Sequence, residues 1–386
     1  MKVTFNKDTV ITGLQKAIAI MPPKTGAAFL RTVWIIAEND SVTFQSTDAN
    51  IEFTGTYGAD VEEPGMVGVQ GQIFHGLISN CLGQLQLSYK EDDNTLYLTH
   101  SNGVCKLPVV TKNWFQEMAK FPEDNAIDWT GDFLQTAINK VIYCIDDESS
   151  LDALTCLLIK PRENKDGKID ICGLNGHQFA MFSFVHEKML EKIPSEGLLI
   201  QRIYLPQISK WLNKDEISIN FTDKRIFFKN KINEIFSVPR VNYEFPDYNN
   251  FLSKLEVDDV SHLHLNRSDL KGALNRISTV NTDIKNCTDF YISEEKNVID
   301  CYAKGESSGE VSEKFNIQYD GNIRKITFRT KDLLTILDHF GSENLTMRIT
   351  TDEGPCGIEG DDDIDYLVVI MPIKTIETSY ESEEAV

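Results

Sequence analysis

The sequence lacks an apolar run long enough to cross a membrane, and it lacks the start of a secretory signal. Its densest apolar run is YLVVIMPI at 366–373, far shorter than the roughly 18 residues that a membrane helix needs. The first residues, MKVTFNKDTV, alternate apolar and polar side chains like a strand instead of presenting a basic segment followed by an apolar one. We therefore expect a cytoplasmic protein with no membrane partner.

Paired cysteine motifs and a basic excess are also missing. The eight cysteines form no CxxC pair, which argues against a zinc site and against structural disulfides. We expect free thiols that pack as small apolar side chains, no metal and no cofactor. The formal net charge of −21 argues against nucleic-acid binding unless the basic residues gather on one surface, because affinity for phosphates rests on lysine and arginine.

Common catalytic signatures such as HExxH and GxxxxGK[ST] do not occur in the chain. His177, in a predicted turn, is better explained as a residue that anchors the turn than as a catalytic base. The acids of EGDDDID at 359–365 are typical of a solvated hairpin loop, because alternate side chains point to opposite sides. We expect no enzyme; an unrecognised site, such as that of a nuclease, is the alternative.

One helical pattern occurs three times along the chain. The stretches ITGLQKAI at 11–18, LQTAINKV at 134–141 and LKGALNRI at 270–277 carry apolar residues at i, i+3 and i+7, which predicts a helix packed on one face. The shared positions are Ile11, Leu134 and Leu270, then Leu14, Ala137 and Ala273, then Ile18, Val141 and Ile277.

A second helix, entered from a strand, follows each of these three. The strands end near Val69, Ile200 and Phe328, and the predicted buried helix positions are Phe74, Leu205 and Leu333, then Leu77, Ile208 and Ile336. Short alternating segments with turn signals lie between the helices and predict antiparallel strands. The prediction is an α+β fold of three repeats, at 1–123, 124–254 and 255–375, with an acidic tail at 376–386.

Four motifs in this order resemble the bacterial sliding clamps, the β subunits of DNA polymerase III. They are the MKVTF start, GLNGHQFA at 173–180, YEFPDY at 243–248 and YLVVIMPIK at 366–374. The resemblance covers residues 1 to about 375. It implies a processivity factor that closes as a head-to-tail homodimer into a ring around duplex DNA, with helices lining the hole and sheets outside.

In such a ring, basic residues of the helices would face the DNA backbone, where contacts carry no sequence information. The resemblance favours Lys24 and Arg202 most. The remaining candidates lie in or beside the predicted helices: Lys16, Lys140, Lys210, Lys271, Arg276 and Lys331. Each of them could instead belong to a solvated helix face.

The resemblance also implies a pocket that binds a short peptide of the polymerase catalytic subunit, the clamp loader and other proteins with a clamp-binding motif. Leu174, Gln178 and Asn250 depart from residues common in the family, so the peptide preference stays open. The pocket carries over onto Leu154, Leu174, Asn175, Gly176, His177, Gln178, Phe179, Pro246, Asn250, Phe251, Pro355, Val369, Ile370, Met371, Pro372 and Ile373.

Two further expectations concern assembly. We expect the dimer interface around Cys105–Val109 on one side and the helix at 270–280 on the other. The alternative to a ring is a monomeric scaffold that keeps the clamp fold and binds partner peptides without encircling DNA. The acidic tail could shield the pocket, although its composition is typical of a disordered extension.

Overall fold

The structure is a computed structural model of the chain that describes residues 1–22, 27–110, 112–162, 166–257, 259–281, 286–293, 297–305 and 307–374. Contacts group these residues into two compact units. The first comprises Met1–Ile138 and Leu198–Asn242, and the second comprises Asn139–Gly197 and the described residues from Tyr243 onward. Three domains are a prediction that these contacts do not test. No helix within the described ranges is long and apolar enough to span a membrane.

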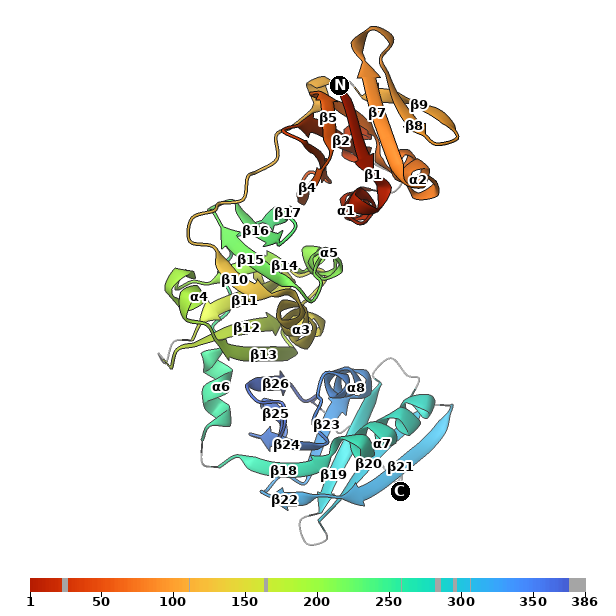
Figure 1. The fold of residues 1–386 in the computed structure, drawn as a ribbon. Coiled ribbons are helices and arrows are strands. Elements are labelled where there is room, and N and C mark those ends of the chain that lie inside the picture. Colours follow the sequence, from red (N-terminus) through yellow and green to blue (C-terminus); the bar gives the residue numbers. More distant parts are fainter. Residues whose placement is uncertain are drawn as a thin grey trace, which may run out of the picture. The chain divides into compact units, whose positions relative to one another are not determined.

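The first unit holds one sheet with the order β10-β15-β16-β17-β4-β3-β2-β6-β9-β8-β7-β1-β5 (Figure 1). Its strands are β1 (Lys2–Asn6), β2 (Thr32–Glu38), β3 (Ser41–Thr47), β4 (Glu52–Gly58), β5 (Asp60–Glu63), β6 (Gly65–Gln70), β7 (Gln84–Lys90), β8 (Thr95–His100), β9 (Gly103–Val110), β10 (Ile127–Thr130), β15 (Glu216–Phe221), β16 (Arg225–Asn230) and β17 (Glu234–Pro239). Its helices are α1 (Lys7–Ala19), α2 (Gly71–Asn80) and α5 (Leu205–Trp211), and β14 (Leu198–Gln201) precedes α5.

The second unit holds a sheet that continues in the order β11-β12-β13-β26-β25-β24-β18-β22, and a separate sheet with the order β21-β20-β19-β23. The strands are β11 (Cys156–Pro161), β12 (Lys168–Leu174), β13 (Gln178–Val185), β18 (Ser261–Asn266), β19 (Cys287–Ser293), β20 (Val298–Gly305), β21 (Gly309–Asn316), β22 (Gln318–Asp320), β23 (Lys325–Arg329), β24 (Asn344–Ile349), β25 (Cys356–Gly360) and β26 (Tyr366–Ile370). The helices are α4 (Glu187–Lys192), α6 (Asn249–Leu255), α7 (Arg267–Val280) and α8 (Thr330–Asp338). Helix α3 (Gly131–Val141) contains the division between the units.

The predicted α+β fold with antiparallel sheets and repeated helix pairs is confirmed. The pairs are α1 with α2, α3 with α5, and α7 with α8. Of the predicted helix positions, all are buried except Ile11 and Leu77, which pack partly buried against the core. Asparagine caps two of the first helices in the same way: the Asn6 side chain accepts from the Asp8 amide, and Asn266 from the amides of Ser268 and Asp269.

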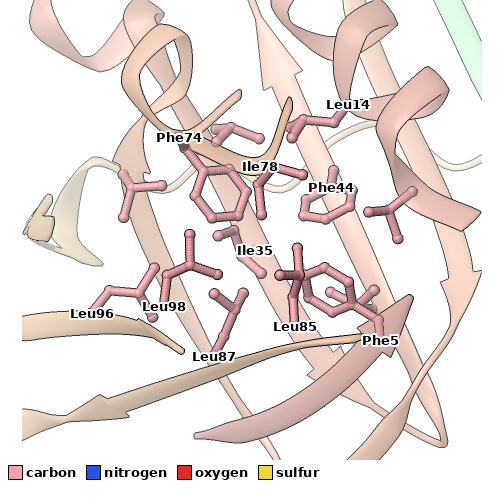
Figure 2. Packing of buried hydrophobic residues seen from close by; sticks show 14 of the residues in the cluster. Phe5, Leu14, Ile35, Phe44, Phe74, Ile78, Leu85, Leu87, Leu96 and Leu98 are labelled. Atoms are coloured by element: carbon pink, nitrogen blue, oxygen red, sulfur yellow. The ribbon is translucent and has the colours of Figure 1, made fainter. Parts of the chain in front are cut away.

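The core of the first repeat lies between α1, α2 and the strands of the sheet. Figure 2 shows Leu14 of α1 and Phe74 and Ile78 of α2 pointing toward Ile35 and Phe44 of the sheet. All five side chains are fully buried. The alternating burial of β3 and β4 explains why the sequence pattern predicted these strands, since every second side chain faces the helices.

The last strand of one repeat pairs with the fourth strand, in chain order, of the preceding repeat. In the first unit β17 pairs antiparallel with β4, with Phe236 opposite Phe53. In the second unit β26 pairs antiparallel with β13, with Val368 opposite Ala180. The chain therefore forms the same type of junction twice.

A buried ion pair accompanies the junction of β17 with β4. Lys16 Nζ lies 2.6 Å from Glu234 Oε2, and the Glu234 side chain is completely buried. The Tyr57 hydroxyl donates to Glu234 Oε1 at 2.8 Å, and Asn230 Nδ2 donates to Oε2 at 2.8 Å. Gly13 makes room for this tyrosine, because a Cβ there would lie 1.5 Å from the Tyr57 hydroxyl oxygen.

A second buried ion pair accompanies the junction of β26 with β13. Lys140 Nζ lies 2.6 Å from Asp363 Oδ1, and the two side chains are 17% and 9% exposed. Asp363 Oδ2 accepts from the amides of Gly341 and Ser342 and from the Ser342 hydroxyl. The prediction that 359–365 is merely a solvated loop is therefore wrong for Asp363, which is held inside by a lysine from α3.

Replacing Asp363 with asparagine is expected to make stability less dependent on pH. Burial raises the pKa of Asp363, but hydrogen bonds from Lys140 and Ser342 outweigh it and hold the pKa below its usual value. A lowered pKa contributes stability above about pH 4, where the unfolded carboxyl ionises, and this contribution is lost as the pH falls through the folded pKa. We expect Asp363→Asn to cost about 3 kcal/mol at pH 7 and less at pH 3.5 in urea unfolding.

The exposed neighbour Asp362 provides the control. Asp362→Asn should leave the free energy of unfolding within about 0.5 kcal/mol of the original at both pH values. An Asp363→Asn deficit that is the same at pH 7 and pH 3.5 would contradict the assignment.

Candidate functional site

The predicted pocket residues gather around the junction of β13 with β26, within the second unit. Gln178 lies opposite Ile370, and Phe179 lies opposite Val369. The amide of Met371 donates to the carbonyl of His177 at 2.9 Å. Two motifs that are nearly two hundred residues apart in the sequence, GHQF and VVIM, are thus joined by backbone hydrogen bonds.

Aromatic side chains form the base of this site. The Phe179 ring, which is buried, stacks on Tyr248 with ring centroids 5.2 Å apart and meets Phe251 edge to face at 5.0 Å. The Tyr248 hydroxyl donates to Asp170 Oδ2 at 3.2 Å. Burial raises the pKa of Tyr248 most, and electrostatic interactions with Cys172 and Asp170 raise it further. The phenol therefore stays protonated, and its hydrogen bond to Asp170 positions the ring.

The apolar side chains beside this base are partly exposed. Leu174, Pro246, Phe251, Pro372 and Ile373 are half-buried. Met371 is 38% exposed, and its unbranched side chain can adapt to different ligands. Apolar area of this kind, with the Asn250 side chain exposed nearby in sequence, suits a short apolar peptide. Leu154, in a short helical turn (Asp152–Thr155), and Pro355, next to β25, are both buried.

The turn at 175–177 is anchored by asparagine and not by histidine, so the prediction for His177 is wrong. Asn175 Oδ1 accepts from the amides of His177 and Gln178, and Gly176 adopts φ +79°, which glycine allows at no steric cost. The His177 side chain is exposed. An asparagine that accepts from amides two and three residues ahead is a known turn signal, and the sequence contained it.

A polar cavity of about 750 Å³ lies toward the other end of β26 from Met371. It is lined by Arg162, Tyr248, Arg348 and Tyr366 among others, and none of the predicted pocket residues lines it. Arg162 is held there by Asp170 Oδ1 at 2.7 Å. Sequence reasoning missed this cavity, because its residues come from segments without a shared motif.

The structure does not leave all the predicted DNA-facing residues available to phosphate. Lys24 lies outside the described residues. The ammonium groups of Lys16 and Lys140 are engaged by buried carboxylates, so the expectation that these two face DNA is not supported by their geometry. The buried acids could not be recognised in the sequence, because they are over two hundred residues away along the chain.

The other basic candidates lie on the helices as expected. Lys271 pairs with Asp338, and Arg276 pairs with Glu313. Lys210, at the end of α5, and Lys331, at the start of α8, are exposed and form no ion pair with a residue in the described ranges. Arg202 is half-buried where β14 leads toward α5.

The described residues contain no group of three or more histidine, cysteine, aspartate or glutamate side chains that could hold a metal ion. The eight cysteines are free, and six of them are buried. The letters GESSG at 305–309 match a nucleophile pattern, GxSxG. Gly305 and Gly309 pair with each other in the antiparallel strands β20 and β21, whereas that pattern requires a strand followed by a helix.

Comparison with known proteins agrees with this geometry. The model of the DNA polymerase III beta subunit N-terminal domain matches residues 1–113, and that of the C-terminal domain matches residues 257–374. The beta sliding clamps of Caulobacter vibrioides and Staphylococcus aureus are 19% and 22% identical, over 97% of this chain and 100% of theirs. The solved DNA polymerase sliding clamp of Caulobacter crescentus superposes with a TM-score of 0.88 at 18% identity, over 97% of this chain and 100% of that one.

The solved DNA polymerase III β subunit of Pseudomonas aeruginosa gives a TM-score of 0.87 at 18% identity, again over 97% of this chain and 100% of that one. The two family models match the first and the last repeat, and the relatives cover 97% of the chain. The chain therefore belongs to the family of β sliding clamps, the β subunits of DNA polymerase III.

Proposed function

We propose that two copies of this chain close head to tail into a ring around duplex DNA and tether partner proteins to it in the cytoplasm. As a DNA polymerase III β sliding clamp, the chain is a processivity factor and not an enzyme. The proposal concerns how this chain assembles, which surfaces it uses and which partners it holds. We propose the polymerase catalytic subunit, the clamp loader and other proteins with a clamp-binding motif as those partners.

The observation that carries the proposal is that one edge of β21 and most of one edge of β9 have no neighbouring strand among the residues that the structure describes. In each junction within the chain, the last strand of one repeat pairs with the fourth strand of the repeat before it. The last strand of the first repeat is β9, which pairs with β6 only at Val109 and Val110. The fourth strand of the third repeat is β21, which lies at the edge of its sheet.

A second copy of the chain is the partner that fits both edges. An exposed strand edge is a template for pairing with another chain. Pairing β21 of one copy with β9 of the other would repeat the junction seen twice within the chain, and twofold symmetry would close the ring. The predicted interface at Cys105–Val109 lies on β9, and α7 (Arg267–Val280) packs on β21.

Contact with DNA is proposed for the basic residues that are not held by buried acids. Lys210 and Lys331 are the best placed of these, because each is exposed on the second helix of its repeat. Lys271, Arg276 and Arg202 remain weaker candidates, and Lys24 stays a proposal from resemblance. Few and solvated phosphate contacts would let a ring slide, because they are sequence-independent and sensitive to salt.

The ring itself is tested by mass and by retention on DNA. We expect a species of about twice 43.7 kDa in sedimentation. Once a loader places it on a nicked circle, it should stay bound at high salt and leave when the circle is cut. A monomer in sedimentation, or retention that does not change when the circle is linearised, would favour the monomeric scaffold instead.

The pocket is tested by truncating its exposed apolar side chain. Met371→Ala should weaken binding of a peptide from the clamp-binding segment of the polymerase catalytic subunit by about tenfold, because it removes apolar contact area. Fluorescence anisotropy with the labelled peptide measures this. Leu82→Ala is the matched control, since Leu82 is 78% exposed and lies in the other unit. Equal affinity of the two variants would contradict the assignment of the pocket.

A further inference from the structure

The polar cavity of about 750 Å³ adjoins the proposed peptide pocket, and helix α6 contributes to both. Phe251 of α6 meets the Phe179 ring at the base of the pocket, whereas Leu252 and Leu255 of the same helix line the cavity. The Tyr248 ring also belongs to both, because it stacks on Phe179 and lines the cavity. The cavity and the proposed pocket therefore share a wall within the second unit.

The floor of the cavity is a sheet, against which α6 lies closely. Leu367 of β26, Glu359 of β25 and Thr346 of β24 pair in one row across three strands, and all three line the cavity. In the same sheet, Gly357 of β25 makes room for the helix, because a Cβ there would lie 2.9 Å from Leu255 Cδ1. The cavity is therefore built on backbone that hydrogen bonds hold in place.

The charged groups of the cavity leave an excess of negative charge. Six carboxylates and two guanidinium groups line it among the described residues. Four of the carboxylates are paired with a cation, namely Asp170 with Arg162, Glu359 with Arg348, Asp363 with Lys140 and Asp365 with Lys168. The other two, Glu256 and Asp361, are exposed and form no ion pair with a described residue. A ligand of this cavity should therefore be a cation.

Apolar side chains lie in the same cavity as these two acids. Ile364 is 78% exposed, and Leu252 is half-buried. Lysine and arginine combine a charged head with an apolar stem that packs along surfaces of this kind. A basic side chain therefore matches both the charge and the apolar area of the cavity.

Strand β26 sets the distance between the cavity and the pocket. Leu367 lines the cavity near one end of the strand, and Met371 belongs to the pocket just beyond the other end. The four residues from Leu367 to Met371 span about 13 Å at the rise of an extended chain. An extended segment of a bound protein would cross from pocket to cavity in about the same number of residues.

We propose that the cavity binds a lysine or arginine that a partner protein carries about four residues beyond its clamp-binding segment. The proposal rests on the proposed function, because the same partner fills the pocket and the cavity. Once the segment occupies the pocket, the second contact forms within the complex, so that even a weak attraction adds to the affinity. Glu256 and Asp361 would thus favour partners with a basic extension over partners without one.

Peptides with matched extensions test this. Each carries the clamp-binding segment of the polymerase catalytic subunit, about four spacer residues and then either two lysines or two glutamines. Both extensions are placed at the N-terminus in one pair and at the C-terminus in another, because either end could point toward the cavity. At one of the ends, the lysine peptide should bind about fivefold more tightly than the glutamine peptide in fluorescence anisotropy.

Two variants separate the cavity from the overall acidity of the chain. Glu256→Gln with Asp361→Asn should abolish the gain from lysine and leave the affinity for the glutamine peptide unchanged. Glu38→Gln with Asp92→Asn is the matched control, since it removes the same charge from exposed acids of the other unit, and it should keep the gain.

The outcomes distinguish this proposal from the pocket on which it rests. Equal affinity of the lysine and glutamine peptides at both ends would overturn the proposal. A gain that survives the loss of Glu256 and Asp361, or that falls as much in the control, would also overturn it, because the attraction would then come from the whole acidic surface. If the glutamine peptides do not bind at all, the pocket itself is refuted.

Discussion

The rest of this structure depends on one constraint. The last strand of a repeat forms backbone hydrogen bonds with the fourth strand of the repeat before it. This pairing joins β17 to β4 and β26 to β13. It also brings the GHQF turn to the VVIM strand, so the residues of the proposed pocket meet at a junction. Within the described ranges, β21 and most of β9 each have an edge with no neighbouring strand, which is where we propose that a second copy pairs.

Internal ion pairs leave the net charge of −21 unchanged, so a ring around DNA requires the remaining basic residues to gather on one surface. Glu234, Asp363 and Asp170 are buried and hold Lys16, Lys140 and Arg162. Glu234 and Asp363 fix the junctions, and Asp170 positions the Tyr248 ring. Because they are buried, these acids do not determine the sign of the charge on a surface lined by helices. Lys210 of α5 and Lys331 of α8 are a better guide to that surface, because both are exposed and neither forms an ion pair with a described side chain.

Local patterns predicted most of the fold. Apolar spacing located the six paired helices, and alternation located strands such as β3 and β20, because both signals depend on neighbours within a few residues. The pocket stays a prediction, but the structure does join two of its motifs, with Phe179 paired opposite Val369. The partners of Lys16 and Lys140 could not be predicted. The local sequence around a lysine on a helix face is the same whether its ammonium group is solvated or binds a carboxylate more than two hundred residues away. The sequence contained the signal for the turn at Asn175, but the turn was assigned to His177 instead.

Hydrogen exchange at two protein concentrations tests the central claim, that β9 and β21 are the edges through which two copies join. Above the dissociation constant of the dimer, the amides of Gly103–Leu107 and Gly309–Asn316 that point away from β8 and β20 should be protected. On dilution below it, these amides should lose protection together, while those through which β17 bonds to β4 and β26 bonds to β13 keep theirs, because those pairings lie within the chain. Protection of β9 and β21 that does not depend on concentration would contradict the account.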